Sequence, residues 1–418
     1  LYFRLFPGLD AAAALLAPGA LICLLTAGGT GRARALAGAA LIAACALAAP
    51  RLHFLKPPAP RPSAVIQTEA SRLALAGGAI YEDARLIHAP EDNWPEEFSG
   101  PALLAGRPGD VLISGSGAYF LLPEVLKHGP SRVFIAEPDP YRAAALAGAS
   151  VAAAGSFTRL AADPRRAGGR YDIIFQTEPS PENAALNRFF TAEYFAGAEA
   201  ALKPGGMLVF SLPFAENYVP PETVYAAACV LASARLSFKS LQLLPTGPRL
   251  TVIASAAPAD LSPARLAAVY SRRGIRNRVV VPAALPLILD PYRISWAGAE
   301  LARVKDPPLN TDLDPLAYFR FWRVWLTMVA SPASLIGLAA LSLACGAAAW
   351  RLARAAAAGG MGAEAFLMGA WAMGLETALM LAYQSATGRL AVQLGFLFSL
   401  FMAGGAAGAW AGLEVKAA

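Results

Sequence analysis

The stretch Asp110-Val-Leu-Ile-Ser-Gly-Ser-Gly-Ala-Tyr-Phe-Leu-Leu-Pro-Glu-Val-Leu-Lys-His128, followed by Arg132-Val-Phe-Ile-Ala-Glu137, decides the fold. A short run of buried-strand type leads into Gly115 and Gly117, a helix-like segment follows, and a second apolar run ends at Glu137. This order predicts a βαβ unit in an α/β protein. Glycines at the first turn allow close approach of a ligand, and an acid about 20 residues on can accept hydrogen bonds from a ribose. The alternative is a tight strand-to-helix turn without a ligand.

The composition divides the chain into apolar and polar parts. Of the 418 residues, 56% are hydrophobic and 15% are charged, which is too apolar for an ordinary globular protein. The apolar excess lies at both ends, and the middle holds most of the charge and proline. The pattern predicts two transmembrane helices in residues 1–55, a linker and β-hairpin subdomain in 56–100, a Rossmann domain in 101–320, and three transmembrane helices in 321–418.

Five apolar runs are the predicted membrane spans, since a spanning helix needs about 20 mostly apolar residues. They are Ala11–Ala27, Ala35–Ala49, Val324–Ala349, Ala363–Tyr383 and Leu390–Trp410. Seven cations flank these runs on the side of the middle region, against five on the other side. This bias favours an integral membrane protein of the bacterial inner-membrane type, with the middle region in the cytoplasm.

Polar residues interrupt the fourth of these runs. Glu376 lies inside it, and Tyr383 and Gln384 follow seven and eight residues later on the same helix face. An ionisable group at membrane depth is costly, so Glu376 is a candidate functional residue. The alternatives are an interhelical hydrogen bond from a protonated Glu376, and a transport or channel role that would need additional helices.

Charge and cysteine content exclude several classes of partner. The net charge is +6 without a basic run, so no nucleic-acid partner is expected. The four cysteines show no paired spacing, which indicates neither a disulfide framework nor a zinc site, and no metal is predicted. The expected partners are the lipid bilayer and either other membrane subunits or a second copy of the chain.

Several motifs of the middle region belong to one recognisable pattern. They are Ile113-Ser-Gly-Ser-Gly117, Glu124-Val-Leu-Lys-His128, Ile135-Ala-Glu137, Tyr171-Asp-Ile-Ile174, Leu186-Asn-Arg-Phe-Phe-Thr191, Leu202-Lys-Pro-Gly-Gly206, Glu216-Asn-Tyr218 and Leu309-Asn-Thr-Asp-Leu-Asp-Pro315. Over about residues 63–320 the chain resembles the spermidine synthase (polyamine aminopropyltransferase) family, in its integral-membrane branch. The segments around Asn187 and Asn310 are more specific than the glycine turn.

The resemblance implies a methyltransferase-like Rossmann domain preceded by a small β-hairpin subdomain. It implies binding of decarboxylated S-adenosylmethionine or a related nucleoside, with Gly115, Gly117, Glu137 and Thr177 as cofactor-binding residues. It also implies transfer of an aminopropyl group to a polyamine amine. Because that amine is a cation in water, a carboxylate must hold it and help to deprotonate it.

The chain departs from the family at the residues that this chemistry needs. The family carries two aspartates at the end of the strand that begins here at Tyr171, and this chain has Thr177 and Ser180 at those positions. Glu178 is the only carboxylate between them. A hydroxyl group cannot act as the base and binds a cation less well than a carboxylate does.

Two further departures concern the nucleoside itself. Ala154-Gly-Ser-Phe157 stands where the family has an acid after its preceding strand, and Asp163 comes farther on. Bulky Tyr119 and Phe120 follow the glycine turn, near the expected place of the cofactor. The polyamine motif Tyr-His-Glu has no clear counterpart near Phe98-Ser-Gly100.

Together these departures predict a domain that has lost its acidic polyamine site. It would serve as a non-catalytic structural or interaction subunit of a membrane complex. The alternative is an active aminopropyltransferase that uses decarboxylated S-adenosylmethionine, with Glu178 as the base.

Overall fold

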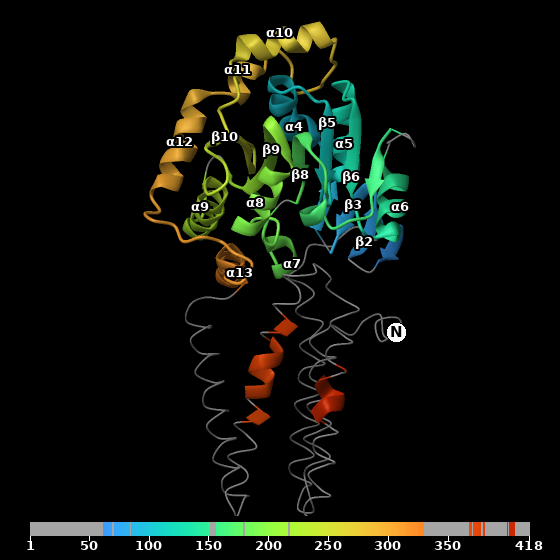
Figure 1. The fold of residues 1–418 in the computed structure, drawn as a ribbon, viewed down its shortest axis with the longest axis vertical. Helices are drawn as coiled ribbons and strands as arrows, with labels where there is room; N and C mark the ends of the chain where they lie inside the picture. The colour runs from blue at the N-terminus through green and yellow to red at the C-terminus, as the bar shows by residue number, and fades with distance from the viewer. Residues whose placement is uncertain are drawn as a thin grey trace, which may run out of the picture. The chain divides into compact units, whose positions relative to one another are not determined.

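The structure is a computed structural model, and the chain divides into two compact units, Leu1–Ser63 and Ala64–Ala418. Almost all of the described residues belong to the second unit. Figure 1 shows the sheets and helices of the second unit. The described residues are 62–68, 71–83, 85–150, 156–178, 180–215, 218–329, 368–369, 371–377, 379–380, 399 and 401–405.

A small antiparallel sheet opens the second unit. Its strands follow the chain in order, β1 (Ala64–Gln67), β2 (Arg72–Ala76), β3 (Ala79–Glu82) and β4 (Arg85–His88). Gly77 and Gly78 join β2 to β3 with φ angles of 59° and 80°, a backbone that glycine adopts without strain. The β-hairpin expected within residues 56–100 corresponds to this sheet, which has four strands.

A seven-stranded sheet forms the centre, with the order β10-β11-β9-β8-β5-β6-β7. Strands β5 and β6 are parallel and adjacent, which confirms the predicted βαβ unit. Strands β10 and β11 add an antiparallel edge, as their apolar runs indicate. The strands are β5 (Asp110–Ser114), β6 (Arg132–Ala136), β7 (Thr158–Leu160), β8 (Tyr171–Gln176), β9 (Leu202–Pro213), β10 (Ser240–Thr246) and β11 (Arg249–Ser255).

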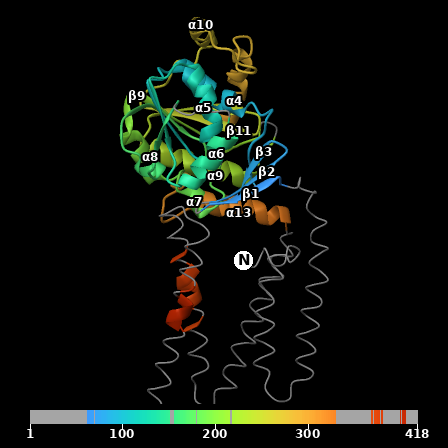
Figure 2. The same ribbon diagram turned by 90° about the vertical axis from the view of Figure 1, so that its right-hand side faces the viewer.

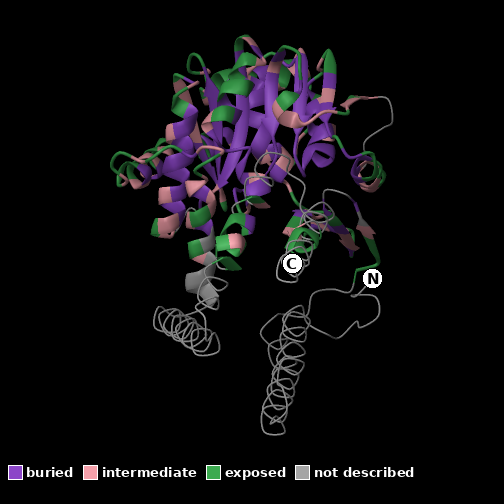
Figure 3. Cartoon of the chain, turned by 60° about the horizontal axis from the view of Figure 1, so that its bottom comes forward, coloured by how far each residue is buried: buried purple, intermediate pink, exposed green. Residues whose placement is uncertain are grey.

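Helices cover both faces of this sheet because its strands are apolar on both sides. In β5, Val111 and Ile113 pack into one hydrophobic cluster, and Leu112 packs into the other. Figure 3 shows the resulting buried centre under partly exposed helices. The helices are α4 (Trp94–Ala105), α5 (Ala118–Lys127), α6 (Pro140–Ala149), η1 (Pro164–Arg166), α7 (Ala184–Asn187), α8 (Ala192–Ala200), α9 (Pro221–Arg235), α10 (Pro263–Arg273), α11 (Leu285–Ile288), α12 (Pro291–Ala302) and α13 (Leu316–Val329).

The expected transmembrane helices and integral-membrane localisation are wrong for the part of the chain that the structure describes. Within that part, no helix is both long enough and apolar enough to cross a bilayer. Helix α13 has 14 residues, fewer than the roughly 20 that a span needs. The runs Ala11–Ala27 and Ala35–Ala49, and most of the three runs near the other end of the sequence, lie outside the described residues.

The order of the strands fixes where a ligand site can form. The chain passes from β5 to β6 and β7 on one side, and then returns to β8 on the other side of β5. In open α/β sheets of this kind, the crevice at the carboxyl ends of the strands beside the reversal is the usual ligand site. Here that position lies between the ends of β5, β6 and β8.

Candidate functional site

A cavity of about 170 Å³ lies at the carboxyl ends of β5, β6 and β8, closed on one side by the small sheet. Figures 1 and 2 both show β2 and β3 beside α6 at this end of the central sheet. The described residues of its wall carry six carboxylates and three guanidinium groups, a formal excess of three negative charges. The carboxylates are Glu82, Asp83, Glu137, Asp163, Glu178 and Glu182, and the guanidinium groups are those of Arg85, Arg142 and Arg188.

Arg142 is the central cation of this wall. Asp139 caps α6 by accepting hydrogen bonds from the backbone N–H groups of Tyr141 and Arg142, and Pro140 begins the helix, so Arg142 stands in its first turn. Nε and Nη2 of Arg142 donate to the two oxygens of Glu82, at 2.7 and 3.2 Å. Nη1 donates to Oε2 of Glu137. A guanidinium from α6 therefore joins the small sheet to the end of β6.

Glu137 thus has partners on both of its oxygens. Oε1 accepts a hydrogen bond of 3.0 Å from the backbone N–H of Asp139, and Oε2 accepts from Arg142. Glu137 lines the cavity, where the resemblance places the ribose-binding acid. A ribose hydroxyl at Oε2 would share that oxygen with Arg142.

Burial and the Arg142 charge act in opposite directions on the nearby acids. Burial alone would raise the pKa of Glu82. The positive charge of Arg142 and the hydrogen bonds from Arg142, Ser116 and Ser71 outweigh this effect and lower the pKa to about 2. Burial raises the pKa of Glu137, and Arg142 offsets that rise only in part. Burial and the Glu82 charge raise the pKa of Glu178. Glu82 is thus the most strongly ionised partner of Arg142.

At the two glycines predicted to bind the cofactor, a side chain would collide with other atoms of the protein itself. Gly115 has a φ of 97°, and a Cβ there would lie 2.8 Å from the backbone nitrogen of Glu178. A Cβ on Gly117 would lie 2.7 Å from the ring of Trp94. Gly115 lines the cavity, whereas Gly117 is not among its lining residues. Their role toward a cofactor stays a prediction.

The hydroxyl groups of Thr177 and Ser180 are both hydrogen-bonded within the protein. Thr177 Oγ1 donates to the carbonyl of Ser114 at 2.7 Å and accepts from the N–H of Gly117 at 3.0 Å. It holds the glycine turn and is not among the cavity-lining residues. Ser180 Oγ donates to Glu182 Oε1 at 2.6 Å.

Glu178 is buried and lines the cavity. Its Oε2 accepts a hydrogen bond of 2.8 Å from Ser116 Oγ, which in turn accepts one of 3.3 Å from Arg142 Nη2. Glu178 is therefore connected to the Arg142 network through one serine. A buried carboxyl with a raised pKa is chemically suited to accept a proton.

Tyr119 and Phe120 do not occupy the cofactor's expected place. Tyr119 is buried in the hydrophobic cluster and meets the ring of Phe157 edge-on at 5.8 Å. Phe120 stacks on His88 with ring centroids 4.3 Å apart. Neither residue is among those that line the cavity. The helix after the glycine turn directs both side chains into the core.

The acid after the third strand is present, contrary to the expectation from Ala154-Gly-Ser-Phe157. The third strand is β7, Thr158–Leu160, so Asp163 follows it by three residues and lines the cavity. Asp163 pairs with Arg188, which is itself buried. Like Glu137, Asp163 is held by an arginine of the cavity wall.

Sequence reasoning missed Arg142, Glu82 and Arg188 as site residues. Arg142 stands five residues after Glu137, in the first turn of the helix that its strand leads into, and that spacing was a usable signal. Glu82 comes from a different sheet, 60 residues from its partner Arg142. Nothing in the sequence indicates that contact.

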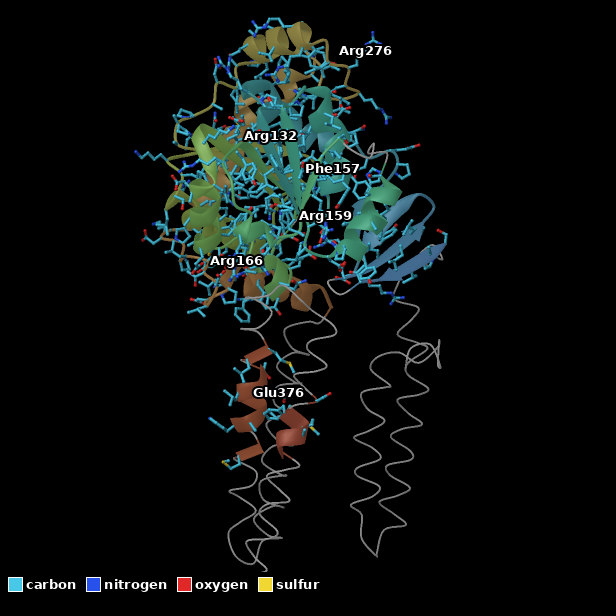
Figure 4. All side chains as sticks on the ribbon, turned by 45° about the vertical axis from the view of Figure 1, so that its right-hand side comes forward. Arg132, Phe157, Arg159, Arg166, Arg276 and Glu376 are labelled. Atoms are coloured by element: carbon cyan, nitrogen blue, oxygen red, sulfur yellow. The ribbon has the colours of Figure 1, made fainter. Side chains whose placement is uncertain are left out.

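Of the three residues predicted in the fourth apolar run, only Glu376 falls on described residues. It lies in the helical segment 371–377, labelled in Figure 4, and is 6% exposed. Its two carboxylate oxygens have no hydrogen-bond partner among the described residues. Tyr383 and Gln384 lie outside them.

No family model matches the chain, and no curated protein sequence matches it either. A spermidine synthase solved in complex with the transition-state analogue AdoDATO is similar in fold, with a TM-score of 0.50 and 16% identity over 58% of this chain and 89% of that one. The spermidine synthase from Thermotoga maritima gives a TM-score of 0.48 at 16% identity, over 58% and 89%. The chain therefore has a spermidine-synthase-like, Rossmann-type α/β fold.

Proposed function

We propose that this spermidine-synthase-like domain is a non-catalytic binding and interaction module that does not transfer aminopropyl groups. The observation that carries the proposal is the state of Thr177 and Ser180. Both stand where the family has aspartates, and both hydroxyls are engaged in hydrogen bonds within the protein. An incoming amine would find no carboxylate at either position to hold it or to take its proton.

Two acids of the cavity wall support binding of a nucleoside-type ligand. Glu137 and Asp163 follow β6 and β7, and their carboxylates face the same cavity as Gly115. Such acids can accept hydrogen bonds from ribose hydroxyls or an exocyclic amine. Decarboxylated S-adenosylmethionine, or a related nucleoside, is the ligand class that this wall fits.

A non-catalytic domain would act through its contacts with other chains. We propose a second copy of this chain or another subunit as the partner. Light scattering of the purified full-length protein, with and without a nucleoside ligand, would detect self-association. A monomer under both conditions would leave only a different subunit as the partner.

Isothermal calorimetry combined with a product assay tests the proposal. We expect decarboxylated S-adenosylmethionine to bind, and no 5′-methylthioadenosine to form when putrescine is added. The double variant Thr177→Asp, Ser180→Asp shows whether restored carboxylates are sufficient for turnover. Product formation by the unaltered protein would overturn the proposal.

A second candidate function is active aminopropyl transfer with Glu178 as the base. Its support is the burial of Glu178 in the cavity wall and its raised pKa. In this reaction the amine attacks the carbon next to the sulfonium, the carbon–sulfur bond breaks to release 5′-methylthioadenosine, and Glu178 takes the amine proton.

Glu178→Gln separates the two functions, with Glu182→Gln as the matched control. Glu182 lines the same cavity, but its side chain is 38% exposed. If Glu178 is the base, Glu178→Gln should lose turnover and Glu182→Gln should keep it. Equal turnover in the two variants would remove Glu178 from the mechanism.

A further inference from the structure

The cavity wall holds the guanidinium group of Arg142 with the hydrogen bonds by which a protein would bind a free guanidinium ligand. Its side chain is 11% exposed. Two N–H groups face the two oxygens of Glu82, a third faces Glu137, and Nη2 also reaches Ser116. Two parallel N–H···O bonds are the geometry by which a planar guanidinium recognises a carboxylate, and an ammonium group cannot reproduce it.

Arg142 and the side chains that accept its hydrogen bonds come from separate parts of the fold. Arg142 belongs to α6, Glu82 to β3 of the small sheet, and Ser116 to the glycine turn. Removing the Arg142 side chain would therefore leave a ligand-sized vacancy beside the cavity of about 170 Å³, lined by the same acceptors.

A second buried guanidinium lies in the same cavity wall. Arg188 lines it and is 3% exposed, and its Nη2 pairs with Asp163. Its Nε has no hydrogen-bond partner among the described residues. The wall of this cavity thus already holds two buried guanidinium groups, each paired with a carboxylate.

We propose that Glu82, Glu137 and Ser116 form a guanidinium-binding site, of which Arg142 is the built-in occupant. While Arg142 is in place, a ligand of the cavity can use Oε2 of Glu137 only by sharing that oxygen with the guanidinium group. A molecule bearing a free guanidinium group is the chemical class that can take its place. The inference does not depend on nucleoside binding or on the absence of aminopropyl transfer.

Removing the occupant tests the site, with methylguanidinium as the probe and calorimetry as the readout. We expect Arg142→Ala to bind methylguanidinium at least tenfold more tightly than the unaltered protein does. Methylammonium should bind the same variant at least tenfold more weakly than methylguanidinium, because it cannot span both oxygens of Glu82. Adding Glu82→Gln to Arg142→Ala should abolish the gain.

Arg159→Ala is the matched control. Arg159 also lies at this edge, but it donates only to the backbone carbonyls of Glu137 and Pro138, at 2.9 and 3.1 Å. Its removal should create no methylguanidinium site. Equal binding by the Arg142→Ala and Arg159→Ala variants, or equal affinity of Arg142→Ala for the two cations, would overturn the proposal.

A folding failure of Arg142→Ala would itself be informative. Refolding would then be compared in methylguanidinium and in methylammonium at equal concentration and ionic strength, with Arg142→Lys as the variant that keeps the charge. The proposal expects recovery in methylguanidinium alone. Recovery in neither cation, or equally in both, would contradict it. Since no nucleoside or polyamine is present, such a failure would leave the proposed function untouched.

Discussion

The two ends of the central sheet each carry a cluster of ion pairs, and the two clusters differ in burial. At the amino end, Arg132 Nε lies 2.7 Å from Asp110, and Lys203 Nζ lies 2.8 Å from both Asp110 and Asp172. At the carboxyl end, Arg142 Nε lies 2.7 Å from Glu82. The bond lengths match, but the Arg132 side chain is 67% exposed and that of Arg142 is 11% exposed.

This difference decides what each cluster contributes. Exposed pairs exchange their contacts with water at little net gain, whereas a buried ion that loses its partner keeps the full cost of desolvation. Hydrogen bonds from Arg132 and Lys203 do lower the pKa of Asp110, but solvent screens that cluster. Figure 4 labels Arg132 at one end of β6 and Arg159 toward the other. We therefore expect mutations at the cavity end to dominate both stability and pH dependence.

The largest effect should come from Arg142→Met, which leaves Glu82 and Glu137 buried without their cation. We expect a loss of about 3–5 kcal/mol in the free energy of unfolding, measured by urea denaturation. The triple variant Glu82→Gln, Glu137→Gln, Arg142→Met removes the unpaired charges and should recover most of that loss. If Arg142→Met were as stable as the unaltered protein, the two clusters of ion pairs would not differ in their contribution to stability.

Acid should weaken the cavity end through Glu82. Its pKa is about 2 in the folded protein against an ordinary value of 4.5, so its stabilisation is fully present above pH 4.5 and is lost as pH falls toward 2. That shift corresponds to about 3 kcal/mol in the free energy of unfolding. Urea denaturation at a series of pH values should show the loss, and Glu82→Gln should flatten the curve in this window. An unchanged slope in that variant would place the acid sensitivity elsewhere.

Thr177→Val should have a smaller effect, because it breaks two neutral hydrogen bonds. The carbonyl of Ser114 and the N–H of Gly117 would both lose their partner. We expect a loss of about 1–3 kcal/mol in the free energy of unfolding. Thr177→Ser keeps the hydroxyl and should lie close to the unaltered protein. A Thr177→Val variant as stable as the unaltered protein would show that the two hydrogen bonds contribute little to stability.

The smallest effect is expected for Arg132→Gln at the amino end. Because Arg132 is exposed and its charge is screened by solvent, the midpoint of urea denaturation of the Arg132→Gln variant should stay close to that of the unaltered protein. High salt should change it little further. A destabilisation as large as that of Arg142→Met would show that burial does not explain the contrast between the two clusters.

Several parts of the candidate site followed from local sequence. The apolar run into Gly115 predicted the strand, the turn and the helix, and Glu137 directly follows the second strand, as its sequence indicates, and lines the cavity. These signals are local, since strand periodicity and turn glycines act over a few residues. The position of Asp163 was missed because β7 has only three residues, too few to show a period.

Other expectations failed because they depended on the packing of side chains. Tyr119 and Phe120 are near the glycine turn in sequence, but the helix directs both into the core. The apolar composition predicted membrane helices, and no described helix meets the requirements for a span. Composition reports how much apolar surface must be covered, and it does not report what covers it.

The sequence by itself determined the α/β framework, the glycine turn and the hydroxyl side chains at Thr177 and Ser180. Only the tertiary structure decided that the acids of the cavity wall are paired, because Arg142 in helix α6 reaches Glu82 in the small sheet across 60 residues. Backbone patterns are set by neighbours in the chain, whereas ion pairing is set by neighbours in space. Burial then determines how much an ion pair contributes to the free energy of unfolding, and no short stretch of sequence contains that information.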